Sequence, residues 1–95
     1  MKIFPCGPEH LAVASDLFNQ YRMFYEQPDD LAGATAFLEA NIVGNRSLVF
    51  LLQEEDGRVV AFSQLYATYC STAMQPYLYL SDLFVVPAAR RKGYA

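Results

Sequence analysis

The chain has 95 residues, near the lower end of the range for one folded domain, so several domains are excluded. Hydrophobic residues make up 54% of it and aromatic residues 15%, which excludes wholesale disorder because such a chain can drive a packed core. Seven basic residues against ten acidic ones give a net charge of −3, which argues against a general binder of nucleic acid or of an anionic membrane.

The first half of the chain predicts a short strand followed by two helices. Residues 2–6 have the composition of a strand, and apolar residues then recur at helical spacing over 8–25. A second helix begins after Asp29 or Asp30, either of which can cap its first turn. The glycine and asparagine at 44–45 end this helix.

The second half predicts three strands joined by short turns. Residues 47–53 are too apolar for a loop and too short for a helix, so they form a buried strand. Residues 54–57 are a hairpin turn that ends in Asp-Gly, and residues 58–69 form the returning strand. After a turn at 71–76, residues 77–86 form the third strand. This order favours an α+β fold with a three-stranded antiparallel meander.

Two cysteines, Cys6 and Cys70, have neither the spacing of metal ligands nor that of a redox pair, so we expect no metal site. We expect both to be buried thiols in a reducing cytoplasm, with a disulfide as the alternative. The N-terminus lacks the long apolar core of a signal peptide, and no stretch approaches the roughly 20 apolar residues of a membrane span.

A basic segment that contains a glycine, Arg90–Ala95, follows the third strand. Gly93 allows the backbone to approach a phosphate without a Cβ in the way, and successive backbone N–H groups in such a loop can bind an anion. The side chains of Arg90, Arg91 and Lys92 would screen the phosphate charge. The segment indicates a phosphate site, with a solvated basic turn as the alternative.

This segment resembles the cofactor motif of the GNAT superfamily of N-acetyltransferases. In that family an apolar strand leads into Arg/Gln-x-x-Gly-x-Gly/Ala. Here the strand end Leu83-Phe84-Val85-Val86-Pro87 precedes Arg90-Arg91-Lys92-Gly93-Tyr94-Ala95, which matches all three defining positions. The order of elements also resembles the N-terminal two-thirds of the GNAT fold, so the resemblance covers essentially the whole chain.

The resemblance implies that the chain binds acetyl-coenzyme A. Backbone groups of the cofactor strand would pair with the pantetheine arm as though the arm were another strand, and amides of the following loop would hold the pyrophosphate. The expected cofactor contacts are Phe84, Val85, Val86, Arg90, Arg91, Lys92, Gly93, Tyr94 and Ala95.

The family also has a bulge in the cofactor strand, and the sequence is consistent with one. Side chains before and after Asp82 cannot share one face unless the alternation slips, and Ser81 would fill the bulge. Asp82 is the candidate general base for an acceptor amine, since a carboxylate that lines the cleft can accept the amine's proton. The alternative is a structural, hydrogen-bonded Asp82.

Two further expectations concern the acceptor and the end of the chain. In the family the connection between the two helices commonly forms a wall of the acceptor site, so Tyr25, Glu26 and Gln27 are expected to touch the acceptor. Ala95 stands where the family's phosphate-binding helix begins. We therefore expect residues 1–95 to be one GNAT-like domain truncated at its C-terminal side, either a fragment or a chain that another polypeptide completes.

The predicted function is that of an N-acetyltransferase, or its N-terminal part, which transfers an acetyl group from acetyl-coenzyme A to an amine of an unidentified acceptor. The 95-residue chain alone is expected to be inactive, and the open edge of its cofactor strand to invite self-association or a complementary C-terminal segment. The alternatives are a non-catalytic coenzyme A-binding or interaction module with a degenerate GNAT fold, and a structural domain whose basic tail docks on an acidic partner.

Overall fold

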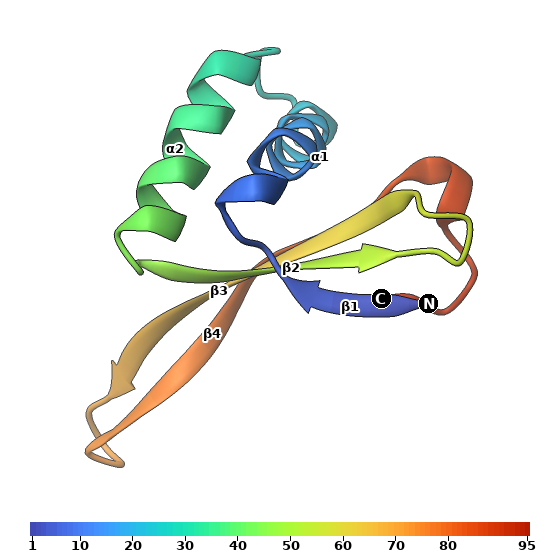
Figure 1. Ribbon diagram of the computed structural model, residues 1–95. Helices are drawn as coiled ribbons and strands as arrows, with labels where there is room; N and C mark the ends of the chain where they lie inside the picture. Colours follow the sequence, from blue (N-terminus) through green and yellow to red (C-terminus); the bar gives the residue numbers. More distant parts are fainter.

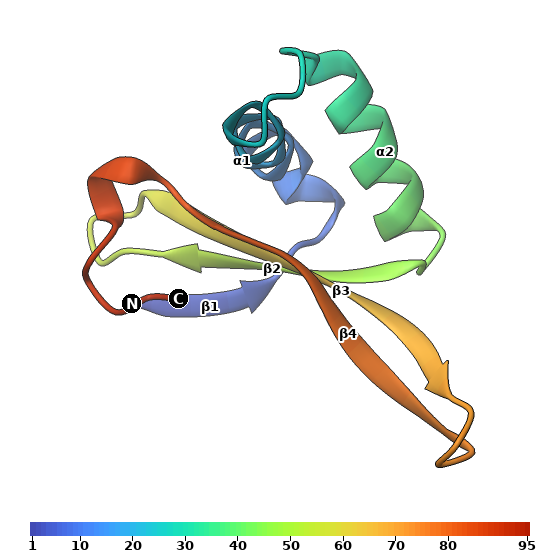
Figure 2. The ribbon, with the colours of Figure 1, turned by 180° about the vertical axis from the view of Figure 1, so that it is seen from behind.

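The computed structural model describes all residues from 1 to 95 and contains one antiparallel sheet in the order β1-β2-β3-β4. Figure 1 shows both helices on one face of this sheet, and Figure 2 shows the same layers from behind. The α+β class and the order of elements are confirmed. The elements are β1 Lys2–Pro5, η1 Pro8–His10, α1 Leu11–Phe24, α2 Leu31–Val43, β2 Ser47–Gln53, β3 Val59–Cys70, β4 Gln75–Val85 and η2 Pro87–Ala89.

The ends of the helices follow from local capping. Asp30, one of the two predicted caps, accepts a hydrogen bond from the Gly33 N–H at 2.9 Å, and Gly44 follows the last residue of α2. The first helix is shorter than predicted, because its first residues form the separate turn η1. In that turn the His10 Nδ1 accepts a hydrogen bond from the Gly7 N–H at 3.1 Å, so the side chain of His10 caps the start of η1.

The predicted bulge in β4 is present and lies at Ser81. Gln64 of β3 is paired with Asp82, whereas the next residue, Leu65, is paired with Leu80, so Ser81 has no partner. Directly paired residues place their side chains on the same face of a sheet. The bulge therefore brings Asp82 onto the face of Gln64, which is the face that the helices cover.

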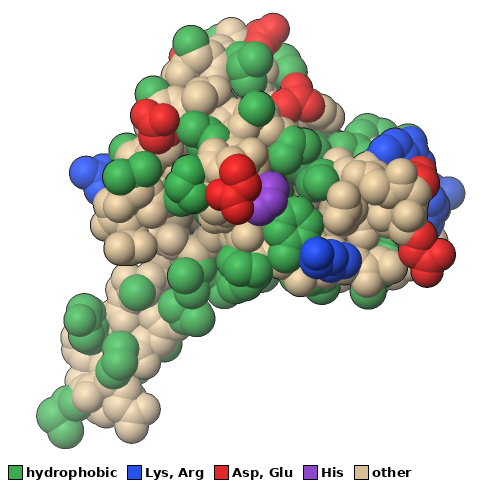
Figure 3. Space-filling model, in the orientation of Figure 1, with side chains coloured by type: hydrophobic (Ala, Val, Ile, Leu, Met, Phe, Trp, Pro, Cys, Tyr) green, Lys and Arg blue, Asp and Glu red, His purple; other side chains and the backbone are tan.

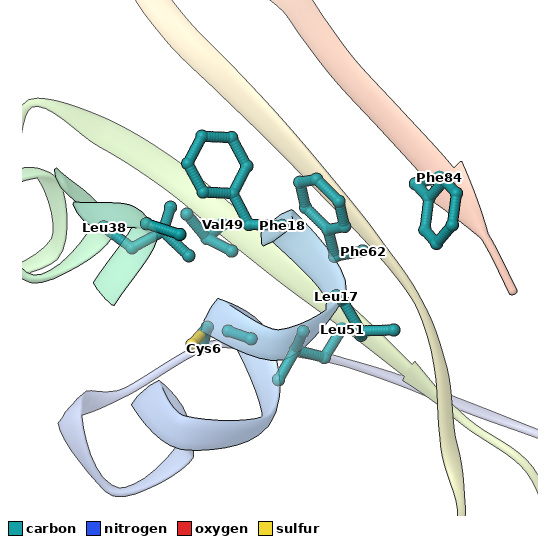
Figure 4. Packing of buried hydrophobic residues seen from close by; sticks show 10 residues of the cluster. Cys6, Leu17, Phe18, Leu38, Val49, Leu51, Phe62 and Phe84 are labelled. Carbon is teal, nitrogen blue, oxygen red and sulfur yellow. The ribbon is translucent and has the colours of Figure 1, made fainter. Parts of the chain in front are cut away.

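The core lies between the two helices and the sheet. Leu38 of α2 and Phe62 of β3 are 0% and 1% exposed, and Phe18 of α1 meets Phe62 edge to face at 6.0 Å between ring centroids. Figure 4 shows these side chains together with Phe84 of β4. Phe24 is 59% exposed, because it lies in the last turn of α1 over the end of β4. The core thus fixes the end of α1 beside the end of β4.

The β3–β4 hairpin extends as an arm beyond the rest of the sheet (Figure 1). Residues 66–80 contain no charged side chain, and Tyr69, Met74 and Leu78 are more than half exposed. In Figure 3 this arm shows only hydrophobic and uncharged groups. The edge of β4 that faces away from β3 has no strand beside it.

The two cysteines are free and differ in their surroundings. Cys6 lies in the core, and burial raises the pKa of its thiol to about 11. Cys70, expected to be buried, is partly exposed, because the arm carries the end of β3 beyond both helices. Neither helix has the length and apolar composition that crossing a membrane requires.

Candidate functional site

The loop after β4 offers a row of unpaired backbone donors. Pro87 opens η2, which separates the strand from the loop Arg90–Ala95. Arg91 and Gly93 have positive φ values of +67° and +78°. The backbone N–H and carbonyl groups of residues 91–95 form no hydrogen bond within the chain. The N–H groups of five consecutive residues are therefore free to meet a ligand, and an anion is the ligand that such a loop favours.

Arg90 fastens the start of the loop to β4. Its Nε donates a hydrogen bond to the Val85 carbonyl at 2.8 Å, and its guanidinium lies 5.1 Å and 5.4 Å from the ring centroids of Phe24 and Phe84. The guanidinium of Arg90 therefore makes cation–π contacts with the end of α1 and the end of β4. Arg90 is thus placed to hold the loop rather than to project toward a ligand.

The other two basic side chains of the loop differ from Arg90 and from each other. The Lys92 Nζ lies 3.0 Å from the Glu54 Oε2, in the turn between β2 and β3. Arg91 makes neither a side-chain hydrogen bond nor an ion pair within the chain, and it is exposed. Arg91 is therefore the cation of the loop that remains available to a phosphate.

The open edge of β4 presents the backbone of Val85. The Val86 N–H donates to the Val60 carbonyl of β3 at 2.9 Å, and Phe84 is paired with Phe62 of the same strand. Because consecutive residues of a strand direct their backbone groups to opposite edges, Val85 faces the open edge. The bond from Arg90 to the Val85 carbonyl agrees with this direction. Of the three strand residues expected to pair with the cofactor, Val85 has its backbone at the open edge.

An open hollow of about 270 Å³ lies beside this edge, between the end of α1 and the end of β4. Tyr25, expected to touch the acceptor, is thereby brought next to residues expected to bind the cofactor. Glu26 and Gln27 do not line the hollow; they lie in the exposed turn after α1, where Glu26 has a φ of +63°. The lining consists of Tyr21, Phe24, Tyr25, Leu83, Phe84, Val85, Arg90 and Ala95.

A second hollow adjoins the first on the side of the loop. It shares Val85, Arg90 and Ala95 with the first hollow, and it adds Arg91, Gly93 and other loop residues. The two hollows form neighbouring compartments, one apolar at the strand edge and one at the unpaired amides. An extended ligand with an apolar arm and an anionic group fits this succession.

Asp82 belongs to a polar network that sequence reasoning missed. The Gln64 Nε2 donates to the Asp82 Oδ2 at 2.9 Å, and the Gln64 Oε1 accepts from the Asn41 Nδ2 at 3.0 Å and from the Ser47 Oγ at 2.8 Å. Gln64 is 0% exposed, so its amide has one fixed set of partners. The available signal was a pair of amides, Asn41 in the predicted second helix and Gln64 in the predicted strand over 58–69.

Two tyrosines lie near the Asp82 carboxylate. Burial and the charge of Asp82 raise the pKa of Tyr21 to about 12, and burial raises the pKa of Tyr66. Both hydroxyls are therefore protonated at neutral pH and can donate hydrogen bonds. Asp82 is half-buried and forms no ion pair with a basic side chain of the chain. No group of three or more His, Cys, Asp or Glu side chains is arranged to hold a metal ion.

Known proteins similar to this chain include acetyltransferases. Residues 12–95 match the acetyltransferase (GNAT) family. The "Uncharacterized N-acetyltransferase YhfO" of Bacillus subtilis (strain 168) is 50% identical over 93 residues, which are 98% of this chain and 62% of that protein. The crystal structure of a probable acetyltransferase matches with a TM-score of 0.90 and 30% identity, over 96% of this chain and 61% of that one.

The fold also matches the crystal structure of a "predicted acetyltransferase with acetyl-CoA" from Clostridium acetobutylicum, with a TM-score of 0.73 and 10% identity. That match covers 98% of this chain and 64% of the other. The chain thus spans less than two thirds of the length of each of these three proteins.

Proposed function

The chain belongs to the acetyltransferase (GNAT) family, and we propose that it is the N-terminal part of an enzyme that transfers an acetyl group from acetyl-coenzyme A to an amine. The observation that carries the proposal is the loop of residues 91–95, whose five unpaired N–H groups follow the open edge of β4. Such a loop can bind a diphosphate through its backbone, while the edge pairs with an extended arm.

Acetyl-coenzyme A would lie along the open edge of β4. The backbone of Val85, and that of Leu83 two residues earlier, face this edge, so they can pair with the amides of the pantetheine arm. Phe84 would supply its ring to the hollow rather than its backbone to the arm. The diphosphate would then meet the amides of residues 91–95, with Arg91 as the nearest free cation.

Asp82 is the proposed general base. The nitrogen of the acceptor amine attacks the thioester carbon, the carbon–sulfur bond breaks, and coenzyme A leaves as the thiolate, which takes up a proton from solvent. Asp82 would accept the proton that the amine loses, and Gln64 would hold its carboxylate in the required orientation. Tyr25 lines the hollow and would contact the acceptor, and Glu26 and Gln27 would contact it from the exposed turn after α1. Most of the acceleration would come from positioning the amine against the thioester.

We also propose where the protein acts and what covers its open edge. Two free cysteines, one of them partly exposed, favour a reducing compartment such as the cytoplasm. The uncovered edge of β4 and the apolar arm would be covered by a complementary C-terminal segment or by a second copy of the chain. Sedimentation of the 95-residue chain as a stable monomer at high micromolar concentration would count against this pairing.

The test is thiol release from acetyl-coenzyme A with a panel of primary amines, together with calorimetric titration of coenzyme A. We expect the full-length protein to bind coenzyme A and to release thiol only when an amine is present, and the 95-residue chain to show no useful turnover. Asp82→Asn should lower turnover at least 100-fold, the size of effect that a general base contributes. A full-length protein without affinity for coenzyme A would refute the function. Full turnover by Asp82→Asn would refute only the role of Asp82.

A further inference from the structure

Three side chains converge on the Glu54 carboxylate. The Tyr94 hydroxyl donates to the Glu54 Oε2 at 2.7 Å, the Lys92 Nζ donates to the same oxygen at 3.0 Å, and the Arg58 guanidinium lies 3.2 Å from the Glu54 Oε1. The side chain of Glu54 is 11% exposed, whereas that of its neighbour Glu55 is 94% exposed. Two of these three donors belong to the loop of unpaired amides, although 38 and 40 positions separate them from Glu54 in sequence.

Glu54 is itself held in place by its backbone. It begins the turn between β2 and β3, where its N–H donates to the Arg58 carbonyl at 2.8 Å and its carbonyl accepts from the Gly57 N–H at 2.9 Å. The carboxylate is therefore a fixed point on the sheet. Lys92 and Tyr94 provide the only side-chain hydrogen bonds between residues 91–95 and the rest of the chain.

The ring of Tyr94 adds an apolar contact to this attachment. It packs against a small buried cluster that includes Leu52, Ala61 and Ala89. Tyr94 and Lys92 thus hold the loop by their side chains, which leaves the N–H groups of residues 91–95 unpaired. A loop that is ordered in this way loses less conformational entropy when a ligand binds to its backbone.

We propose that Glu54 is a positioning residue for the diphosphate of coenzyme A: it anchors Lys92 and Tyr94, and thereby keeps the backbone amides of residues 91–95 arranged for phosphate oxygens. The inference rests on the proposed function. It also assigns different roles to the loop's cations, since Glu54 neutralises Lys92 and leaves Arg91 to meet the ligand. The opposite role, a latch that withholds Lys92 from the ligand, would make removal of Glu54 tighten binding.

The test compares two acetyl donors in the full-length protein: acetyl-coenzyme A and S-acetylpantetheine, which lacks the diphosphate. Glu54→Ala should lower kcat/KM for acetyl-coenzyme A at least tenfold and should leave kcat/KM for S-acetylpantetheine within twofold. Glu55→Ala, a matched control at an exposed neighbouring carboxylate, should change neither value. Glu54→Gln keeps a neutral acceptor for both loop donors and should recover part of the loss.

Tyr94→Phe provides a second variant that keeps the ring and removes only the hydroxyl, so it tests the anchor if Glu54→Ala does not fold. It should lower kcat/KM for acetyl-coenzyme A by a smaller factor than Glu54→Ala does, and it should again leave kcat/KM for S-acetylpantetheine nearly unchanged. Equal losses with both donors would overturn the proposal in favour of a general structural role, and tighter binding of coenzyme A by Glu54→Ala would overturn it in favour of the latch. A wild-type protein that uses neither donor would refute the proposed function itself.

Discussion

Replacing Gly93 by valine tests whether the loop binds through its backbone. Gly93 has a φ of +78°, and no atom lies within 4 Å of where a Cβ would be, so a side chain there meets no steric obstacle within the chain. The cost is conformational: a left-handed backbone costs an L-residue about 1–2 kcal/mol, and a β-branched residue is among the least tolerant. If the loop must keep this angle to bind, that cost corresponds to a loss of roughly 5- to 30-fold in affinity for coenzyme A.

Asparagine at the same position separates two causes of such a loss. Asparagine adopts positive φ values more readily than other residues that carry a Cβ. If the angle matters, Gly93→Asn should retain most of the affinity that Gly93→Val loses. If the Cβ itself collides with the diphosphate, both variants should bind weakly.

Calorimetric titration of coenzyme A into folded full-length variants measures the effect, with circular dichroism to confirm folding. The wild-type protein and Gly93→Asn serve as references for Gly93→Val. Unaltered affinity in both folded variants would mean that the loop does not bind coenzyme A through a backbone that depends on the angle at Gly93.

Three further predictions follow from the site and the core. Arg91→Ala should weaken coenzyme A binding in a salt-dependent manner, because Arg91 has no partner within the chain. Arg90→Ala should lower thermal stability and weaken coenzyme A binding with less dependence on salt, because Arg90 bonds the loop to β4; calorimetry at two salt concentrations and thermal melts separate the two effects. Gln64→Leu should lower the free energy of unfolding, measured with urea, by about 1–3 kcal/mol, because it leaves buried polar partners unpaired. At pH 8 a thiol reagent should label Cys70 in the folded chain, and Cys6 only after denaturation. Burial raises the pKa of Cys6 to about 11, so only about one in a thousand of its thiols is ionised at that pH.

The fold was predictable because each element carries a local signal. The cap at Asp30, the glycine that ends α2 and the Asp-Gly turn before β3 are chemical requirements that a sequence displays directly. The bulge at Ser81 was implied by the resemblance to the GNAT family, and the slip in the alternation of side chains along this strand was consistent with it.

What the sequence did not reveal depends on contacts between distant segments. Glu54 was expected only as part of a hairpin turn, yet it meets Lys92 and Tyr94 from the other end of the chain. Gln64 and Asn41 were passed over because their polarity has meaning only once α2 lies over β3. Such pairs are fixed by the packing of whole elements, and no window of neighbouring residues contains them.

The three defining residues of the motif at the end of the chain have different structural roles. Its arginine, Arg90, bonds to the Val85 carbonyl and covers aromatic rings, so it secures the loop to the strand. Its glycine, Gly93, supplies the backbone angle, and its last position, Ala95, lines both hollows with a small side chain. None of the three needs to contact the ligand with a polar side chain. If the backbone is the binding surface, then the motif specifies conformation and space, and the charge that meets the phosphate can come from a position that the motif leaves free, here Arg91.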